Sequence, residues 1–385
     1  MANDKDFVVA GAVEVGKDTK VALGTVTSNN IDLATGNYFA DTLAANTTYT
    51  ISNAGDVQAF QLEVTGGAIL TDTWDISTAV FSNQNFSFSS QSSFMRTGFF
   101  KPDGTKMYMG SISTNSIYEY DLSTAWDVST VSYTSKSFSI SSQEDSVSGL
   151  FFKTDGTKMY LCGKAGDDVN EYNLSTAWDV STASYNQNFS VSGQETNPSG
   201  LFFRDDGLKM YLTGNTGDDV NEYTLTTAWD ISTASYVQSK SVAGSGVGQD
   251  NNPNGIFFKE DGLQMYFAGE DNSYINEYAL STAWDISTAS YTQRFDISSQ
   301  EIYAKGISFK PDGSKVFVFG EHGNDVSEYD IGSSSAATLT WPSSIEWAGG
   351  IAPSAPAGGE TDVYTLVTDD GGTSYVGVKT ADNIS

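Results

Sequence analysis

Carboxylates recur through this chain at nearly constant spacing, and they are the side chains best able to do chemistry. One set precedes glycine, with steps of 52, 51, 55 and 51 residues: Asp103, Asp155, Asp206, Asp261 and Asp312. A second set precedes tyrosine: Glu119, Glu171, Glu222, Glu277 and Glu328. Two carboxylates can act together on a glycosidic bond, and several can hold calcium. Both sets recur in every repeat, as residues with a structural role do. Catalysis and calcium binding are therefore each compared with a structural role.

Turn geometry is the favoured role for the aspartates. Asp tolerates tight turns and the following Gly supplies a positive φ, so the Asp-Gly pairs predict hairpins. Four other loop aspartates are candidates for weak calcium ligands: Asp167, Asp168, Asp218 and Asp219. They lack the dense alternating oxygens of a strong calcium loop, so Asx turns are the favoured interpretation. No other cofactor is expected.

The glutamates that precede tyrosine fall inside an apparent strand, where an unpaired carboxylate would be costly. A basic residue ends the first strand of every repeat: Lys101, Lys153, Arg204, Lys259 and Lys310. We therefore expect the five glutamates to pair with these five bases, within a repeat or between repeats.

Other catalytic groups are scarce. The one histidine, His322, occupies a loop, and the one cysteine, Cys162, occupies a strand position that is apolar or small in other repeats. The sequence contains no GxSxG, HExxH or phosphate-binding glycine loop. The sequence therefore lacks the usual motifs of nucleophilic and zinc-dependent catalysis. A glycosidase or lyase that uses carboxylates is the one class of enzyme that the sequence still allows.

A unit of about fifty residues positions these carboxylates, and a period of that size indicates a repeat architecture. Residues 149–191 show it best: an apolar run, an Asp-Gly turn, then KMYLCG, DDVNEYNL and ASYNQNFSV as three further strand patterns. No window has a sustained helical period. Four antiparallel strands per repeat predict the blade of a β-propeller.

The repeats are offset at the two ends of the chain. A Trp-Asp pair starts one repeat early and stops one repeat early, at Trp74, Trp126, Trp178, Trp229 and Trp284. The last repeat, residues 302–331, has three strands, and residues 72–90 supply a connection and a fourth. Because pairing them removes two exposed edges, we predict a five-bladed propeller closed by the N-terminal strand. Because these tryptophans occupy the same place in every repeat, we expect their indole rings to pack within the protein and not to stack on a sugar.

The flanking segments do not repeat, but both have strand patterns. Together they give about seven strands, a normal number for a β-sandwich. Propeller closure brings residues 72 and 332 together, and insertion is tolerated where entry and exit are adjacent. We therefore predict an all-β chain: residues 1–71 as an N-terminal arm and half a sandwich, residues 72–332 as the propeller, and residues 333–385 as the other half.

The charged-residue composition of the chain argues against two classes of binding partner. The net charge is −29, with 19 basic and 48 acidic residues. Nucleic acids and anionic membrane surfaces attract basic proteins, so neither is an expected partner. No apolar stretch is long enough for a secretory signal or a membrane span. We expect synthesis in a cytoplasm without membrane insertion.

Several ordered segments resemble a small β domain of tailed-bacteriophage structural proteins. They are DLATGNYFADTLAANTTYTISN, FQLEVTGG, LTWPSSIEWAGGIAP and VYTLVTDDGGTSYVGV. In those relatives the second segment runs almost directly into the third, whereas here the repeats separate them. The repeat itself, FFKPDGTKMY followed by EYDLSTAWD, resembles YVTN-like propellers. The resemblance implies a virion protein, made in the host cell, that contacts other virion proteins and forms a homo-oligomer.

Three functions follow from this resemblance. The first is attachment to a host surface glycan by a non-enzymatic tail or head protein. The second is particle decoration without a receptor, and the third is a propeller glycosidase or lyase acting on host polysaccharide. For ligand contact we expect the longest non-repeating loop, residues 243–255, and the next one along the chain: Gln249, Asp250, Asn251, Asn252 and Tyr274.

Overall fold

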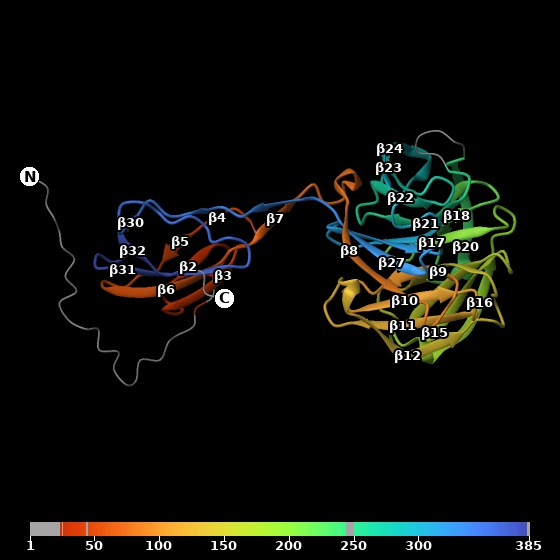
Figure 1. Ribbon diagram of the computed structural model, residues 1–385, viewed down its shortest axis with the longest axis horizontal. Coiled ribbons are helices and arrows are strands. Elements are labelled where there is room, and N and C mark those ends of the chain that lie inside the picture. The colour runs from red at the N-terminus through yellow and green to blue at the C-terminus, as the bar shows by residue number, and fades with distance from the viewer. Residues whose placement is uncertain (1–23, 25, 44, 244–249, 383–385) are drawn as a thin grey trace, which may run out of the picture. The chain divides into compact units, whose positions relative to one another are not determined.

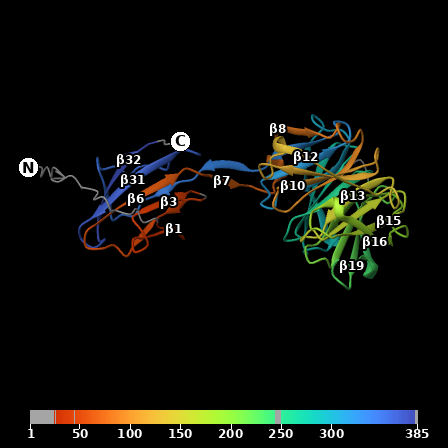
Figure 2. The ribbon, with the colours of Figure 1, turned by 90° about the horizontal axis from the view of Figure 1, so that it is seen from below.

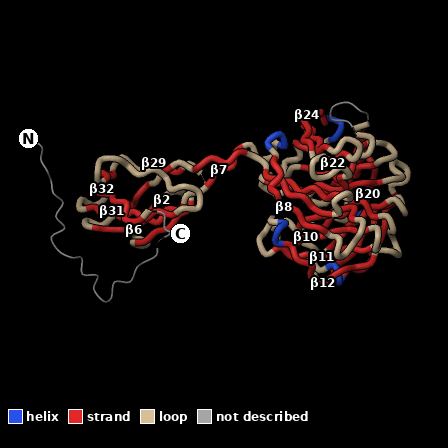
Figure 3. The backbone as a smooth tube through the Cα atoms, in the orientation of Figure 1, coloured by secondary structure: helices blue, strands red, loops and turns tan. Residues whose placement is uncertain are grey.

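The computed structural model describes residues 24, 26–43, 45–243 and 250–382. Regular structure in this part of the chain consists of β-strands and short 3-10 turns (Figure 3). None of its helical segments has the length and apolar character needed to cross a membrane. The chain divides into two compact units, residues 72–333 and residues 1–71 with 334–385.

Residues 72–333 form a β-propeller of four-stranded antiparallel sheets, which we number I to V (Figure 1). Sheets I and II follow the chain: β9 (Met95–Phe100), β10 (Lys106–Ser111), β11 (Ser116–Leu122), β12 (Val131–Ser139); β13 (Val147–Phe152), β14 (Lys158–Gly163), β15 (Asp168–Leu174), β16 (Ala183–Ser190). Sheets III and IV do the same: β17 (Pro198–Phe203), β18 (Lys209–Gly214), β19 (Asp219–Leu225), β20 (Ala234–Ser241); β21 (Pro253–Phe258), β22 (Gln264–Gly269), β23 (Tyr274–Leu280), β24 (Ala289–Asp296).

Sheet V joins the two ends of the repeats. It contains β25 (Ala304–Phe309), β26 (Lys315–Gly320) and β27 (Asp325–Asp330), and its fourth strand is β8 (Val80–Ser87). β8 pairs antiparallel with β27, with Gln84 opposite Glu328, which is the pairing that the offset of the repeats predicts. The first strands of neighbouring sheets contact one another in a cycle, from β9 through β13, β17 and β21 to β25 and back to β9. Figure 2 shows β10, β13 and β19, which belong to three successive sheets.

A glycine and a tryptophan fix the corner of every sheet. In sheet III, Gly207 of the Asp-Gly hairpin has φ +70°, and a Cβ built on it would lie 2.5 Å from the indole of Trp229. Trp229 itself has φ +62° and stacks on Phe203 at a ring-centroid distance of 5.6 Å. The indole therefore fills the corner between the hairpin and the neighbouring sheet. A 3-10 turn follows each tryptophan: η1 (Ile76–Thr78), η2 (Val128–Thr130), η3 (Val180–Thr182), η4 (Ile231–Thr233) and η5 (Ile286–Thr288).

The expected pairing of the buried glutamates was wrong. Each base at the end of a first strand pairs with the hairpin aspartate two residues later: Lys101–Asp103, Lys153–Asp155, Arg204–Asp206, Lys259–Asp261 and Lys310–Asp312. The first strand is separated from the glutamate strand by the whole second strand, and adjacent strands lie about 4.8 Å apart. A residue on the second strand is closer, and it forms the pair.

The glutamates instead join neighbouring sheets. Lys106 Nζ lies 2.7 Å from Glu119 Oε1, and the other oxygen of Glu119 accepts the Val180 N–H of sheet II at 3.1 Å. Lys158, Lys209 and Lys315 pair with their glutamates in the same way. In sheet IV the second-strand residue is Gln264, whose amide donates to Glu277 Oε1 at 3.0 Å.

The other unit is built from both ends of the chain. Its larger sheet has the order β3 (Tyr38–Thr42), β6 (Gln58–Thr65), β31 (Thr361–Thr368), β32 (Tyr375–Ala381), β30 (Ile345–Trp347). The smaller strands are β1 (Val26–Thr27), β2 (Asn30–Asp32) and β5 (Thr50–Ser52) in one sheet, and β4 (Thr47–Thr48) with β29 (Leu339–Thr340) in another. One hydrophobic core is shared by these segments, and it includes Ile31, Phe39, Leu62 and Tyr364. The connecting strands β7 (Ala68–Thr71) and β28 (Ser333–Ala336) pair with each other.

Candidate binding site

A polar pocket lies where the first strands of the propeller begin. The second residue of each first strand is Arg96, Ser148, Ser199, Asn254 or Lys305, and all five line a cavity of about 260 Å³. Polar residues from the neighbouring loops also line it: Ser146, Lys164, Asn197, Asn215 and Glu270. Every sheet contributes at least one of these side chains, so the site depends on closure of the ring.

Two cations of this pocket are held by two carboxylates. Lys305 is only 4% exposed and its ammonium contacts both Glu270 and Glu321, the latter at 3.4 Å. Arg96 Nη1 lies 2.7 Å from the same Glu321 carboxylate. A buried ammonium needs such partners, because an isolated charge away from water is very costly. This network fixes the cations of sheets I and V.

The opposite wall of the pocket carries polar groups without protein partners. Among the described residues, the side chains of Ser146, Lys164 and Asn197 make no hydrogen bond or ion pair. Asn215 Oδ1 is buried and likewise lacks a partner. With Arg96 and Lys305, the pocket region holds three cations against the carboxylates of Glu270 and Glu321. The arrangement offers unused hydrogen-bond donors, among them the ammonium group of Lys164.

A set of buried acids holds the loops that surround this pocket. Glu195 Oε1 accepts the N–H of Asn197 at 2.5 Å and of Thr216 at 3.1 Å, and its Oε2 accepts the N–H of Gly217 at 3.0 Å. The equivalent acids in the other sheets are Glu144, Asp250 and Glu301, and sheet I has Ser92. Burial raises the pKa of the Glu144 carboxyl. The expected site residues did not include Glu144, Glu195 or Glu301, and they gave Asp250 another role, although a glutamine precedes each of these acids in the repeat.

The residues expected to contact a ligand do not form the pocket. Gln249 lies outside the described residues. Asp250 is fully buried and accepts the Asn252 N–H at 2.8 Å, so it shapes its own loop, and burial raises its pKa. Asn252 donates to Asp271 at 2.6 Å, and the ring of Tyr274 is covered by Arg294 at 3.9 Å. Asn251 is exposed and does not line the pocket. Within residues 243–255, the residue that lines this pocket is Asn254.

The four aspartates considered for calcium are also placed differently. Asp167 and Asp168 belong to sheet II, whereas Asp218 and Asp219 belong to sheet III. Asp168 accepts hydrogen bonds from the amides of Asn170 and Asn188, both at 2.6 Å. No three acidic, histidine or cysteine side chains in the described ranges are grouped as metal ligands. The carboxylates of Asp168 and Asp219 accept hydrogen bonds within their sheets, whereas Asp167 and Asp218 adopt a positive φ in the turns before β15 and β19.

The remaining candidates for chemistry have structural surroundings. His322 is exposed in the loop between β26 and β27. Cys162 is buried, and burial raises the pKa of its thiol to about 12. Trp74, Trp126 and Trp229 are less than a tenth exposed, so their faces pack within the protein and are not open platforms.

No protein-family model matches the chain, and no curated protein matches it. Solved structures do resemble it. A periplasmic gluconolactonase from Pseudomonas aeruginosa is 16% identical over 63% of this chain and 69% of that one, with a TM-score of 0.38. A functionally unknown protein from Desulfotomaculum acetoxidans is 11% identical over 64% and 90%, with a TM-score of 0.41. The β-propeller domain of Cps50 (Swd1) from Myceliophteria thermophila is 8% identical over 66% and 99%, with a TM-score of 0.38. These likenesses concern the fold alone.

Proposed function

We propose that this chain is a non-enzymatic structural protein of a tailed-phage particle that attaches to an acidic glycan of the host surface. In this proposal sheets I to V are the five blades of a propeller inserted into a split β-sandwich. The sandwich docks on other virion proteins, as part of a homo-oligomer, and the propeller carries the polar pocket. The likeness of the flanking segments to a phage structural domain supports the virion assignment.

The polar pocket is the observation that carries the binding proposal. The protein has a net charge of −29, so it does not attract anions in general. An anionic ligand is therefore attracted only by a local group of cations, and this pocket has one. Lys164, Asn197 and Ser146 supply donors that the protein itself leaves unused. Sugar hydroxyls need such donors and acceptors, and a carboxylate on the sugar would pair with the Lys164 ammonium group.

The ion-pair network favours binding over glycoside hydrolysis. Glu270 and Glu321 both contact Lys305, so two carboxylates do lie close together. A glycosidase needs one carboxyl as a proton donor and the other as a nucleophile or base. Here both are engaged by cations, and Asn254 also donates to Glu270 at 2.9 Å. They are therefore better suited to holding Lys305 in place.

A binding assay with two polysaccharides tests this proposal. The purified protein is titrated with polygalacturonate, which carries a carboxylate on each sugar, and with dextran, which is neutral. We expect binding to polygalacturonate only, and at least a tenfold loss in Lys164→Glu. Lys240→Glu makes the same charge change on the outer strand β20 and should bind normally. Equal losses in both variants would contradict a role for the pocket.

Reducing-end release and particle imaging separate the alternatives. Glycan binding without new reducing ends is expected, whereas their release would favour a glycosidase. Labelled antibody against the chain should decorate a tail or head appendage in micrographs of intact particles. Labelled particles that bind no glycan would favour a decoration protein, and unlabelled particles would overturn the virion assignment.

A further inference from the structure

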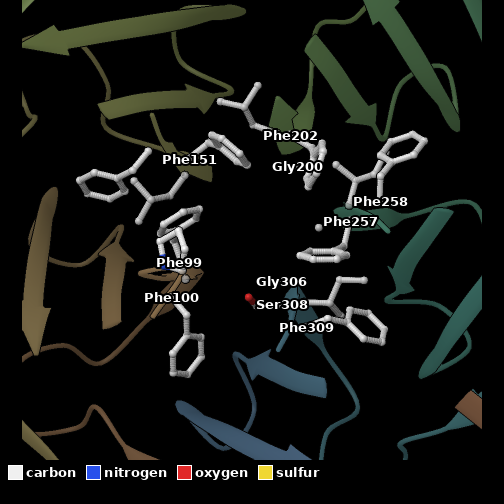
Figure 4. Close-up of a pocket in the computed structure, with 18 of the residues that line it drawn as sticks. Phe99, Phe100, Phe151, Gly200, Phe202, Phe257, Phe258, Gly306, Ser308 and Phe309 are labelled. Carbon is white, nitrogen blue, oxygen red and sulfur yellow. The ribbon is translucent and has the colours of Figure 1, made fainter. Parts of the chain in front are cut away.

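A ring of phenylalanines surrounds a second space, at the other end of the same first strands (Figure 4). The residue before the last in each first strand is Phe99, Phe151, Phe202 or Phe257 in sheets I to IV. Neighbouring rings meet edge to face, with centroids 5.3, 5.3 and 5.5 Å apart. Sheet V has Ser308 at this position, so the ring is open on one side.

The ring lines a cavity of about 280 Å³. Glycines of the first strands, including Gly200 and Gly306, also line the cavity, and hairpin residues form its rim. Small-molecule pockets in proteins have volumes of roughly 300–1,000 Å³ and mostly apolar walls. This cavity is close to the lower end of that range, which favours a compact ligand with an aromatic or aliphatic body.

Ser308 places a hydroxyl group in the ring of phenylalanines. Its side chain is 8% exposed, and the part of the chain that the structure describes contains no hydrogen-bond partner for its hydroxyl. Figure 4 shows its oxygen directed into the space that the phenylalanines surround. A hydroxyl that faces a cavity can hydrogen-bond to a polar atom of a ligand that displaces water from it.

The rim of the cavity is acidic on one side. Its residue from each hairpin is Pro102, Thr154, Asp205, Glu260 or Pro311. The neighbouring bases Arg204 and Lys259 already pair with Asp206 and Asp261, and Asp205 and Glu260 form no ion pair among the described residues. The pKa of Asp205 is raised by burial and then by the charge of Glu260. Two adjacent sheets therefore present carboxylates that a cation would stabilise.

We propose that this cavity binds a small hydrophobic amine. The apolar body packs among Phe99, Phe151, Phe202 and Phe257, and the ammonium group faces Asp205 and Glu260. Ser308 accepts or donates a hydrogen bond to the ligand within the cavity. The site is separate from the polar pocket, so this inference does not depend on glycan attachment.

Three probes of one shape test the inference by calorimetry on the full chain. 4-Phenylbutylamine is cationic, 4-phenylbutanol is neutral and 4-phenylbutyrate is anionic at pH 7. We expect the amine to bind at least tenfold more tightly than the alcohol and the carboxylate not to bind. Equal binding of amine and carboxylate, or no amine binding at millimolar concentration, would overturn the proposal.

Two variants locate the binding. Ser308→Phe places in sheet V the residue of the other four sheets, so it should fold, close the ring and abolish binding of the amine and the alcohol. Asp205→Asn with Glu260→Gln should weaken amine binding about tenfold and leave alcohol binding unchanged. The control Asp56→Asn with Asp369→Asn removes the same charge from the other unit, where both residues are exposed. Amine binding that survives both pocket variants would contradict the assignment.

Discussion

At the scale of single residues, Glu277 differs from the four glutamates in the same strand position. Glu119, Glu171, Glu222 and Glu328 each have a lysine partner, whereas Glu277 has the neutral amide of Gln264. Glu277 is 3% exposed, and burial raises its pKa. Hydrogen bonds from Gln293 and Gln264 oppose this shift but do not cancel it.

We expect Gln264→Lys to stabilise the propeller at neutral pH. Because the folded-state pKa of Glu277 is raised, its stabilising contribution is complete below its unfolded pKa and is lost as the pH rises through its folded value. A lysine at residue 264 favours the ionised form and removes this loss. Urea unfolding should show a gain of about 1 kcal/mol at pH 7 and a smaller gain at pH 4.

Lys209→Gln is the matched control, since it gives sheet III the arrangement of sheet IV. It should lose about 2 kcal/mol at pH 7 because it leaves Glu222 buried without its charge partner. Equal effects of Gln264→Lys at both pH values would contradict the titration of Glu277 as the cause.

The residue scale is also where prediction from sequence was weakest. The repeat identified the glutamates as buried, but two sets of bases recur with the same period, and spacing alone does not say which is adjacent. The register of the sheet determines which base is the partner. Glu171 lies opposite Tyr160, and Lys158 is two residues from Tyr160 on the same strand, so Lys158 is the adjacent base. Lys305 and Arg96 could not be predicted as pocket residues for a different reason. They occupy strand positions at which the other repeats have Ser or Asn, so they form no repeated pattern.

At the scale of elements, the hairpin and the tryptophan corner act as one unit. The carbonyl of Gly207 accepts the Trp229 N–H at 3.0 Å, and the indole lies where a Cβ of residue 207 would be. The strands of this unit could be predicted, since apolar alternation and the Asp-Gly turn are local signals. The positive φ of the tryptophan could not, because it depends on packing between sheets.

Gly207→Ala should therefore be strongly destabilising. Residue 207 has a positive φ, which strains any residue with a Cβ, and the new methyl group would lie 2.5 Å from the indole of Trp229. The backbone strain and the displaced packing together cost about 3 kcal/mol or more. A fall in the thermal midpoint, with loss of the near-ultraviolet signal of tryptophan, is the measurement. Gly193→Ala is the comparison, because nothing lies within 4 Å of its Cβ position and no change beyond about 0.5 kcal/mol is expected. Similar midpoints for the two variants would rule out the corner as the cause.

At the scale of the whole molecule, one strand determines whether the propeller is a closed ring. β8 covers the edge of β27, and it comes from a part of the chain more than two hundred residues away. The offset of the repeats was enough to predict this pairing. The two pockets could not be predicted in the same way, because each is formed by side chains from all five sheets and depends on how far apart the ring holds them.

Two fragments test the ring directly. A chain of residues 72–333 contains all five sheets and one compact unit, so we expect a monomer with a cooperative unfolding transition. A chain of residues 91–333 lacks β8 and leaves β27 with unpaired backbone groups along one edge, a template for pairing with other chains. It also lacks Trp74 and η1, which form the corner next to Gly313. It should elute as oligomers or aggregate, and a synthetic peptide of residues 72–90 should restore the monomer. A monomeric, equally stable shorter fragment would show that β8 is dispensable, and the ring would then have to be held by the contacts between β25 and β9 alone.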